Sequence, residues 1–120
     1  MKKILIVDDE PNIVMTLEYT FKKSNYEVFI ARDGQEALDI LKTNFPDVII
    51  LDIMMPMVDG FATLEQIRKD ANLQHTKVMF LSAKNKESDI EKGLALGADA
   101  YMTKPFSIKK VVEKMEELLS

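Results

Sequence analysis

Short apolar runs alternate with amphipathic stretches along this chain, and each kind of segment occurs five times. The apolar runs cover residues 4–7, 28–31, 48–51, 78–81 and, more weakly, 99–102. Their apolar residues are consecutive rather than placed at every second position, which predicts strands covered on both faces, as in a parallel sheet. The pattern therefore favours folds in which helices cover both faces of a central sheet.

The stretches between these runs carry the spacing and the end signals of helices. Ile13, Leu17 and Phe21 recur every four residues, and Pro11 suits the first turn of that helix. Further helix ends are indicated by Asp33, Asp59 and Ser107 as N-terminal caps and by Gly97 as a C-terminal cap. Alternating strands and helices predict an α/β fold with right-handed crossovers. Because a domain usually has about 100–200 residues, we expect a single domain over residues 1–120.

The composition excludes several classes of site. The chain has no cysteine and one histidine, which rules out disulfides, cysteine-based zinc sites, thiol nucleophiles and multi-histidine metal sites. Its net charge of -4 argues against a general nucleic-acid binder, which would carry a basic excess. The apolar run near the N-terminus is too short for a signal peptide or a membrane span. We therefore expect a cytoplasmic protein that does not bind a membrane.

Polar side chains follow the apolar runs at the points where the predicted strands end. Asp8 and Asp9 follow the first run, Asp52 the third and Ser82 the fourth, while Lys104 lies two residues beyond the fifth. In open α/β sheets, ligands bind beyond the carboxyl ends of the strands, so we expect these groups to converge. Two carboxylates about 5 Å apart repel by ~3 kcal/mol at an effective dielectric constant near 20, and a hard divalent cation would relieve this repulsion.

Each of these residues has a simpler interpretation when it is taken alone, because aspartate is common in turns and at helix starts. Together, the three aspartates favour a site for a divalent cation and a phosphoryl group. Ser82 and Lys104 would then contact the phosphate oxygens by a hydrogen bond and an ion pair.

Four segments of the chain resemble the receiver domain of two-component response regulators. They read ILIVDDE at residues 4–10, DVIILDIMMPMVDG at 47–60, LSA at 81–83 and GADAYMTKPF at 97–106. In order and spacing, this resemblance covers essentially the whole chain. It implies the flavodoxin-like (βα)₅ fold, a doubly wound parallel sheet with the strand order 2-1-3-4-5.

The resemblance also implies roles for individual residues. Asp52 matches the phosphoacceptor, which would take a phosphoryl group from a sensor histidine kinase or a phosphotransfer protein and form an aspartyl phosphate. Mg²⁺, for which Mn²⁺ can substitute, would be held by Asp8, Asp9, Asp52 and the backbone carbonyl of Met54. The phosphate would be bound by Lys104, Ser82 and Ala83.

Further roles concern switching and the lifetime of the phosphate. Ser82 and Tyr101 match the hydroxyl and the aromatic residue of the family's switch. The Lys104–Pro105 peptide bond is expected to be cis, a geometry essentially confined to proline. Met54 and Lys84 match the positions that control water access, and they predict slower dephosphorylation than Asn at position 54 and Glu at position 84.

Phosphorylation is expected to alter the face made by the fourth helix, the fifth strand and the fifth helix. An output protein or domain would dock on that face. A receiver of this kind would catalyse only its own phosphoryl transfer and dephosphorylation, and it would not itself bind nucleic acid. A monomer and a phosphorylation-dependent dimer are both compatible with the sequence.

Three interpretations compete. In the first, the chain is a stand-alone receiver. In the second, it is a receiver taken from a longer protein, such as a DNA-binding transcription regulator or a hybrid histidine kinase. Asp99–Ala100 and Lys109–Lys110 depart from the patterns common in regulators with winged-helix DNA-binding domains. An unrelated flavin-binding or magnesium-phosphatase module is disfavoured, because the chain has no Ser/Thr-rich loop after the first strand, no P-loop and no Asp-x-Asp at residues 52–54.

Overall fold

The computed structural model describes all 120 residues, and strands and helices alternate along it as the sequence predicts. The strands are β1 (Lys3–Val7), β2 (Glu27–Ala31), β3 (Val48–Leu51), β4 (Lys77–Ser82) and β5 (Ala100–Thr103). The helices are α1 (Pro11–Lys23), α2 (Gly34–Ile40), α3 (Gly60–Lys69), α4 (Glu87–Ala95) and α5 (Ile108–Leu119), with a short 3₁₀ turn at Ala71–Leu73. No helix is both long enough and apolar enough to cross a membrane.

All five strands are parallel and lie in the order β2-β1-β3-β4-β5, which confirms the predicted topology. The register places Val7 of β1 beside Ala31 of β2 and Leu51 of β3. The central strands β1 and β3 therefore end side by side at one edge of the sheet. Residues that follow them meet at the reversal of strand order, where ligand sites form in such sheets.

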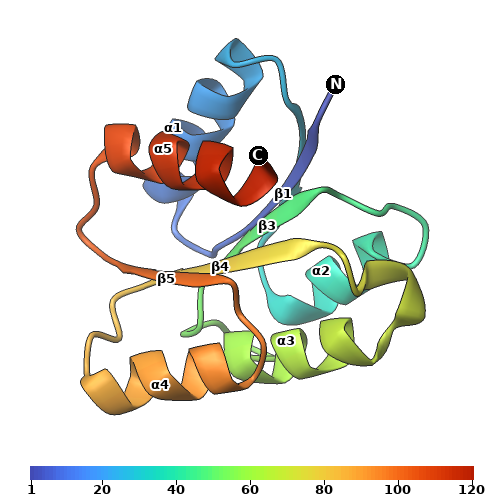
Figure 1. The fold of residues 1–120 in the computed structure, drawn as a ribbon, viewed down its shortest axis with the longest axis vertical. Coiled ribbons are helices and arrows are strands. Elements are labelled where there is room, and N and C mark those ends of the chain that lie inside the picture. The colour runs from blue at the N-terminus through green and yellow to red at the C-terminus, as the bar shows by residue number, and fades with distance from the viewer.

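Helices cover both faces of the sheet, with α1 and α5 on one face and α2, α3 and α4 on the other (Figure 1). Alternate residues of a strand point to opposite faces, so Leu5 belongs to one buried cluster while Ile4 and Ile6 belong to the other. Full burial of one such side chain contributes about 1.5–3 kcal/mol. The two clusters hold the central strands from both sides and make a rigid base for the residues at their ends.

The predicted helix caps are confirmed. The Asp33 side chain accepts from the backbone N–H of Glu36, Asp59 accepts from that of Ala62, and Ser107 accepts from that of Lys110. Gly97 follows α4 with a φ of 109°, a conformation that residues with a Cβ atom rarely adopt. An N-terminal cap contributes ~1 kcal/mol, so these residues fix where the helices begin and how the loops leave the sheet.

Candidate functional site

Two aspartates extend the central strands at the carboxyl edge of the sheet. The backbone N–H of Asp8 donates to the carbonyl of Ala31 at 3.1 Å, and that of Asp52 donates to the carbonyl of Val7 at 2.9 Å. The hydrogen bonds between strands thus continue one residue past β1 and β3, which fixes the backbone of both aspartates. Asp8 and Asp52 are almost completely buried, with 2% and 3% of their surface exposed.

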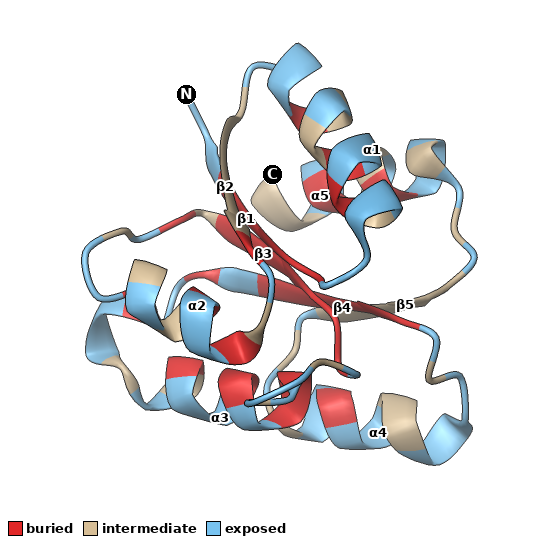
Figure 2. Cartoon of the chain, turned by 180° about the vertical axis from the view of Figure 1, so that it is seen from behind, coloured by how far each residue is buried: buried red, intermediate tan, exposed pale blue.

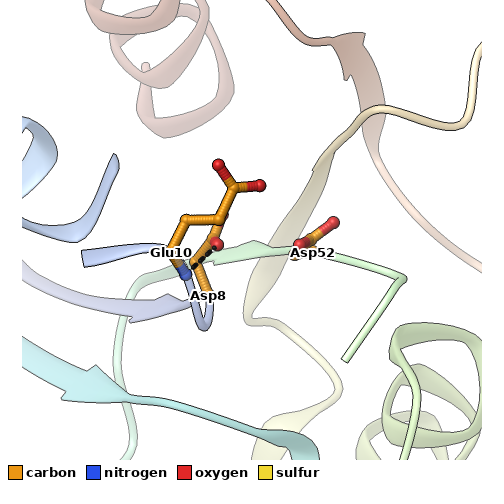
Figure 3. Close-up of side chains that lie close together, drawn as sticks. All are labelled: Asp8, Glu10 and Asp52. Carbon is orange, nitrogen blue, oxygen red and sulfur yellow. Dashed lines mark hydrogen bonds between the residues drawn. The ribbon is translucent and has the colours of Figure 1, made fainter. Parts of the chain in front are cut away.

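Glu10 joins these aspartates in a group of three carboxylates (Figure 3). One oxygen atom from each of Asp8, Glu10 and Asp52 lies within 4.8 Å of the other two. The backbone N–H of Glu10 donates to Oδ1 of Asp8 at 3.0 Å, and that of Ile53 donates to Oδ1 of Asp52 at 2.7 Å. These bonds orient the two aspartates and leave the Oδ2 atom of each for other partners.

The ammonium group of Lys104 is the partner of all three carboxylates. Its Nζ atom lies 2.9 Å from Oδ2 of Asp8, 3.0 Å from Oε1 of Glu10 and 3.4 Å from Oδ2 of Asp52. The backbone N–H of Lys104 donates to the carbonyl of Ser82 at 2.9 Å, which ties the lysine to the end of β4. Lys104 thereby connects the ends of β1 and β3 through its side chain and the end of β4 through its backbone.

The charges of this group are not balanced. Burial raises the pKa of the Asp8 carboxyl, and hydrogen bonds from the Glu10 backbone and from Lys104 only partly oppose that effect. Burial lowers the pKa of Lys104, but its bonds to Asp8 and Glu10 outweigh this and raise that pKa above its ordinary value. One ammonium therefore faces three carboxylates. A further cation with a preference for oxygen ligands fits this donor set.

The backbone of Lys84 links two other predicted site residues. Its N–H donates to Oγ of the fully buried Ser82 at 3.2 Å, and its carbonyl accepts from the Tyr101 hydroxyl at 2.6 Å. The Tyr101 ring is centred 5.8 Å from the Phe80 ring, and burial raises the pKa of the Tyr101 hydroxyl. A movement of either Ser82 or Tyr101 therefore changes a bond to the same loop residue.

The sequence model of the response regulator receiver domain matches residues 4–116, almost the whole chain. The chain belongs to the response regulator receiver family. Its fold and its place in a family of signalling proteins are those expected from the four sequence segments.

Relatives of this receiver include a longer protein. The receiver is similar to the alkaline phosphatase synthesis transcriptional regulatory protein PhoP of Bacillus subtilis (strain 168), with 45% identity over 118 residues. The match covers 98% of this chain and 48% of PhoP, so the receiver spans about half the length of that relative.

Solved structures share the fold over their whole length. The chemotaxis response regulator CheY4 of Vibrio cholerae aligns with a TM-score of 0.93 at 31% identity over 99% of both chains. The BeF3-activated DrrB receiver domain aligns with a TM-score of 0.91 at 27% identity, over 99% of this chain and 97% of that domain.

Most of the predicted site residues of this receiver lie around the carboxyl edge of the sheet. Asp8, Asp52 and Lys104 are in direct contact, and the buried Ser82 ends the neighbouring strand β4. Ala83 is exposed directly after β4, Met54 is exposed shortly after β3, and Lys84 is partly buried. The Lys104–Pro105 peptide bond is cis.

Asp9 and Glu10 differ from the expectation for the acidic group. Asp9 is exposed and lies outside the group of three carboxylates, whereas Glu10, which the sequence reasoning missed, belongs to it. The chain bends at Asp9, and the hydrogen bond from the Glu10 N–H to Oδ1 of Asp8 closes this bend. The bend places the Glu10 carboxylate beside Lys104, and no local sequence signal indicates it.

Proposed function

We propose that this receiver accepts a phosphoryl group on Asp52 in a magnesium-dependent reaction. A sensor histidine kinase or a phosphotransfer protein would supply the group, and a small acyl phosphate could replace it in vitro. The observation that carries the proposal is the placement of Asp52, whose buried Oδ2 atom lies 3.4 Å from the Lys104 ammonium beside two further carboxylates. Membership of the receiver family supports the same reaction.

The acidic group suits a magnesium ion, for which Mn²⁺ can substitute. Mg²⁺ commonly takes one or two carboxylates, waters and a phosphate oxygen as ligands. Asp8, Asp52 and the backbone carbonyl of Met54 would hold the ion, with the contribution of Asp9 that the family resemblance implies. When bound, the ion would neutralise charge on the phosphoryl oxygens as they approach the carboxylates.

The transfer itself needs a nucleophile and a fixed positive charge. Oδ2 of Asp52 would attack phosphorus, so that a P–O bond forms while the P–N bond to the donor histidine breaks and its electron pair stays with the imidazole. Lys104 stays protonated because its pKa is raised, and its ammonium would stabilise the transferred oxygens. Ser82 and Ala83 would contact the phosphate oxygens once the group is in place.

The phosphate would change the surface of the receiver through Ser82 and Tyr101. Ser82 would leave its bond with the Lys84 N–H to reach the phosphate, and this would move the loop whose carbonyl accepts from Tyr101. Tyr101 lies on β5 and would transmit the movement to the face made by α4, β5 and α5. A coupling of roughly 1–3 kcal/mol changes the affinity for a partner by about 5–150-fold.

Met54 and Lys84 would lengthen the lifetime of this phosphate. The thioether of Met54 is a weak hydrogen-bond acceptor and cannot orient a water molecule as an amide can. We expect the Met54→Asn, Lys84→Glu double variant to lose phosphate faster than the wild type in a single-turnover decay assay. Equal or slower loss from the double variant would contradict this assignment.

We propose two alternatives for how the receiver controls its output. In the first, residues 1–120 act as one domain in the cytoplasm and dock on a separate partner, as a monomer or a phosphorylation-dependent dimer. In the second, the receiver controls a domain of a longer protein, and the similarity to PhoP, a transcriptional regulatory protein of about twice this length, favours a regulator of that kind. In both, the receiver itself binds neither nucleic acid nor a membrane.

The proposal is tested by intact-protein mass spectrometry after incubation with acetyl phosphate, with and without Mg²⁺. One phosphoryl group is expected on the wild type in the presence of Mg²⁺, and none on Asp52→Asn. Asp33→Asn is the matched control, because the half-buried Asp33 caps α2 and asparagine caps as well as aspartate. A phosphoryl group that persists in Asp52→Asn would overturn the assignment.

A further inference from the structure

The Glu10 carboxylate contacts the ammonium group of Lys104 and has no evident structural role of its own. Glu10 occupies the N-terminal cap position of α1, but its side chain makes no capping hydrogen bond. The bond that Glu10 gives to Asp8 comes from its backbone N–H and does not depend on the side chain. The contact that remains for the carboxylate is the 3.0 Å ion pair with Nζ of Lys104.

The three carboxylates surround the ammonium group of Lys104. An ammonium group has three donors, and it faces Asp8 at 2.9 Å, Glu10 at 3.0 Å and Asp52 at 3.4 Å. Once Oδ2 of Asp52 has bonded to phosphorus, its contact with Lys104 passes to the phosphoryl group. A second bond from Lys104 to a phosphoryl oxygen then requires Asp8 or Glu10 to give up its contact.

Exposure identifies the carboxylate that can leave at the lowest cost. The Asp8 and Asp52 side chains are 3% and 4% exposed, whereas the Glu10 side chain is 56% exposed. Release of the buried Asp8 carboxylate would leave an unpaired charge out of contact with water, which is strongly unfavourable. The Glu10 carboxylate would simply be rehydrated, so it is the partner that can be exchanged.

We propose that Glu10 is a positioning residue for Lys104, and that its carboxylate is exchanged for the incoming phosphoryl group. Before transfer it holds the ammonium beside Asp52, and during transfer it competes with the phosphoryl oxygens for the same donor. This inference rests on the proposed phosphorylation of Asp52. Its consequence is that Glu10 raises the concentration of phosphoryl compound needed to occupy the site, without taking part in bond formation.

The test uses Glu10→Gln in the full chain, with Glu65→Gln as the matched control. Glutamine keeps the length of the Glu10 side chain and the backbone bond to Asp8 while removing the charge. Glu65 is an exposed residue of α3, so its variant carries the same change of charge elsewhere. Each variant is titrated with beryllium fluoride, a mimic of the phosphoryl group, at saturating Mg²⁺ by NMR, and the rate of labelling is measured against acetyl phosphate concentration.

Glu10→Gln is expected to lower the half-saturating concentration of beryllium fluoride by roughly two- to fivefold, the change expected for an ion pair of this exposure. The acetyl phosphate concentration that gives half the limiting rate of labelling should fall likewise. Glu65→Gln should change neither concentration. Because both assays use saturating Mg²⁺, the effect of the lost charge on Mg²⁺ binding does not enter the comparison. Glu10→Ala should behave as Glu10→Gln does, because the lost charge rather than the new amide causes the effect.

Two results would overturn this inference while leaving phosphorylation of Asp52 intact. The first is an unchanged half-saturating concentration in Glu10→Gln, which would mean that Lys104 does not need to leave Glu10. The second is a higher half-saturating concentration in Glu10→Gln, which would mean that Glu10 assists rather than competes with the phosphoryl group. Failure of the wild type to take up phosphate would overturn the proposed function instead, and this inference with it.

Discussion

Helices α3 and α4 lie on the same face of the sheet but are attached to it in different ways. Helix α3 buries Gly60, Phe61, Thr63, Leu64 and Ile67, whereas α4 buries Gly93 alone. Buried residues recur along α3 in Figure 2, while most of α4 is exposed or half-buried. Since the burial of apolar surface supplies most of the stabilisation of a fold, α3 belongs to the core and α4 rests on it.

The contacts that do hold α4 are few and lie at separate points. A Cβ atom at Gly93 would be 2.9 Å from the Phe80 ring and 3.2 Å from the Tyr101 ring, so the helix backbone packs directly on two aromatic side chains. At the other point, the Arg68 guanidinium of α3 donates twice to the carbonyl of Gly97, at 3.0 and 2.8 Å, just beyond the C-terminal end of α4.

This difference bears on the proposed switch. A segment with few buried contacts can shift or open at a lower free-energy cost than a segment within the core. Tyr101 packs against Gly93 and also bonds to the loop that precedes α4. A change at Tyr101 would therefore move α4, while α3 and the central strands keep the site in place.

The largest expected effect is a difference in the free energy of unfolding between a variant of α3 and a variant of α4. Leu64→Ala is expected to lower the free energy of unfolding by about 2–5 kcal/mol, because Leu64 of α3 is fully buried. Leu94→Ala in α4 removes a side chain that is 46% exposed, and it should change that free energy by less than about 0.5 kcal/mol. Urea denaturation measures both. Similar losses in the two variants would show that α4 is packed as firmly as α3.

The next effect tests the contact at Gly93. Alanine is normally favoured over glycine inside a helix by about 0.5–1 kcal/mol. Here the added Cβ would collide with the Phe80 and Tyr101 rings, and overpacking typically costs about 1–3 kcal/mol. We expect Gly93→Ala to lower the free energy of unfolding by about 1–2 kcal/mol and to shift the NMR signals of the Tyr101 ring.

The sign of the Gly93→Ala effect is the informative result. A variant that is more stable than the wild type would mean that α4 moves away from the aromatic rings without cost. The control is Ala95→Gly, at an exposed residue of the same helix, which tests helix propensity without a change in packing.

A smaller effect tests the tie between Arg68 and the C-terminal end of α4. The guanidinium also donates to the carbonyl of Thr76 at 2.9 Å and to Asp99 at 3.0 Å. Arg68→Met keeps much of the side-chain volume and should lower the free energy of unfolding by about 1–2 kcal/mol, because the partners of the guanidinium can partly rehydrate. Faster hydrogen exchange is expected at the N–H of Ala98, which donates to Gly93.

Lys69→Met is the control for Arg68→Met, since Lys69 is the exposed neighbouring cation on α3. If both variants exchange the Ala98 N–H at the same rate, Arg68 does not hold this end of α4. If exchange rises along the whole of α3 as well, the guanidinium stabilises the core rather than one end of a helix.

The strands, helices and caps could be predicted from the sequence because their signals are local, whereas the strand order followed from the family resemblance. The consecutive apolar residues of β1, β3 and β4 are what strands covered on both faces require, and the capping residues Asp33 and Asp59 act on amides three positions away. The fifth strand starts one residue later than predicted, at Ala100, because the Asp99 side chain instead bonds to Arg68 and to the backbone N–H of Val78.

The candidate site could be predicted only in part, because its contacts depend on geometry between distant residues. The aspartates and Lys104 could be predicted from the rule that ligand sites form beyond the carboxyl ends of the strands. Whether Asp9 or Glu10 faces the lysine depends on the path of the backbone after β1. The contacts of Arg68 with Gly97 and Asp99 join residues 29 and 31 positions apart and have no local signal, so the sequence could not indicate that Arg68 holds the segment that follows α4.

The smallest expected effect concerns the side-chain contact between the two helices. Nζ of Lys92 in α4 lies 4.5 Å from the centre of the Phe61 ring in α3. Lys92→Met keeps an apolar side chain of similar length, so chiefly the interaction of the charge with the ring is lost, at a cost of about 0.5–1 kcal/mol. Lys86→Met, at an exposed lysine that precedes α4, should cost nothing measurable by urea denaturation. Equal stability of the two variants would remove Lys92 from the contacts that hold α4, and the helix would then depend on Gly93 and Arg68.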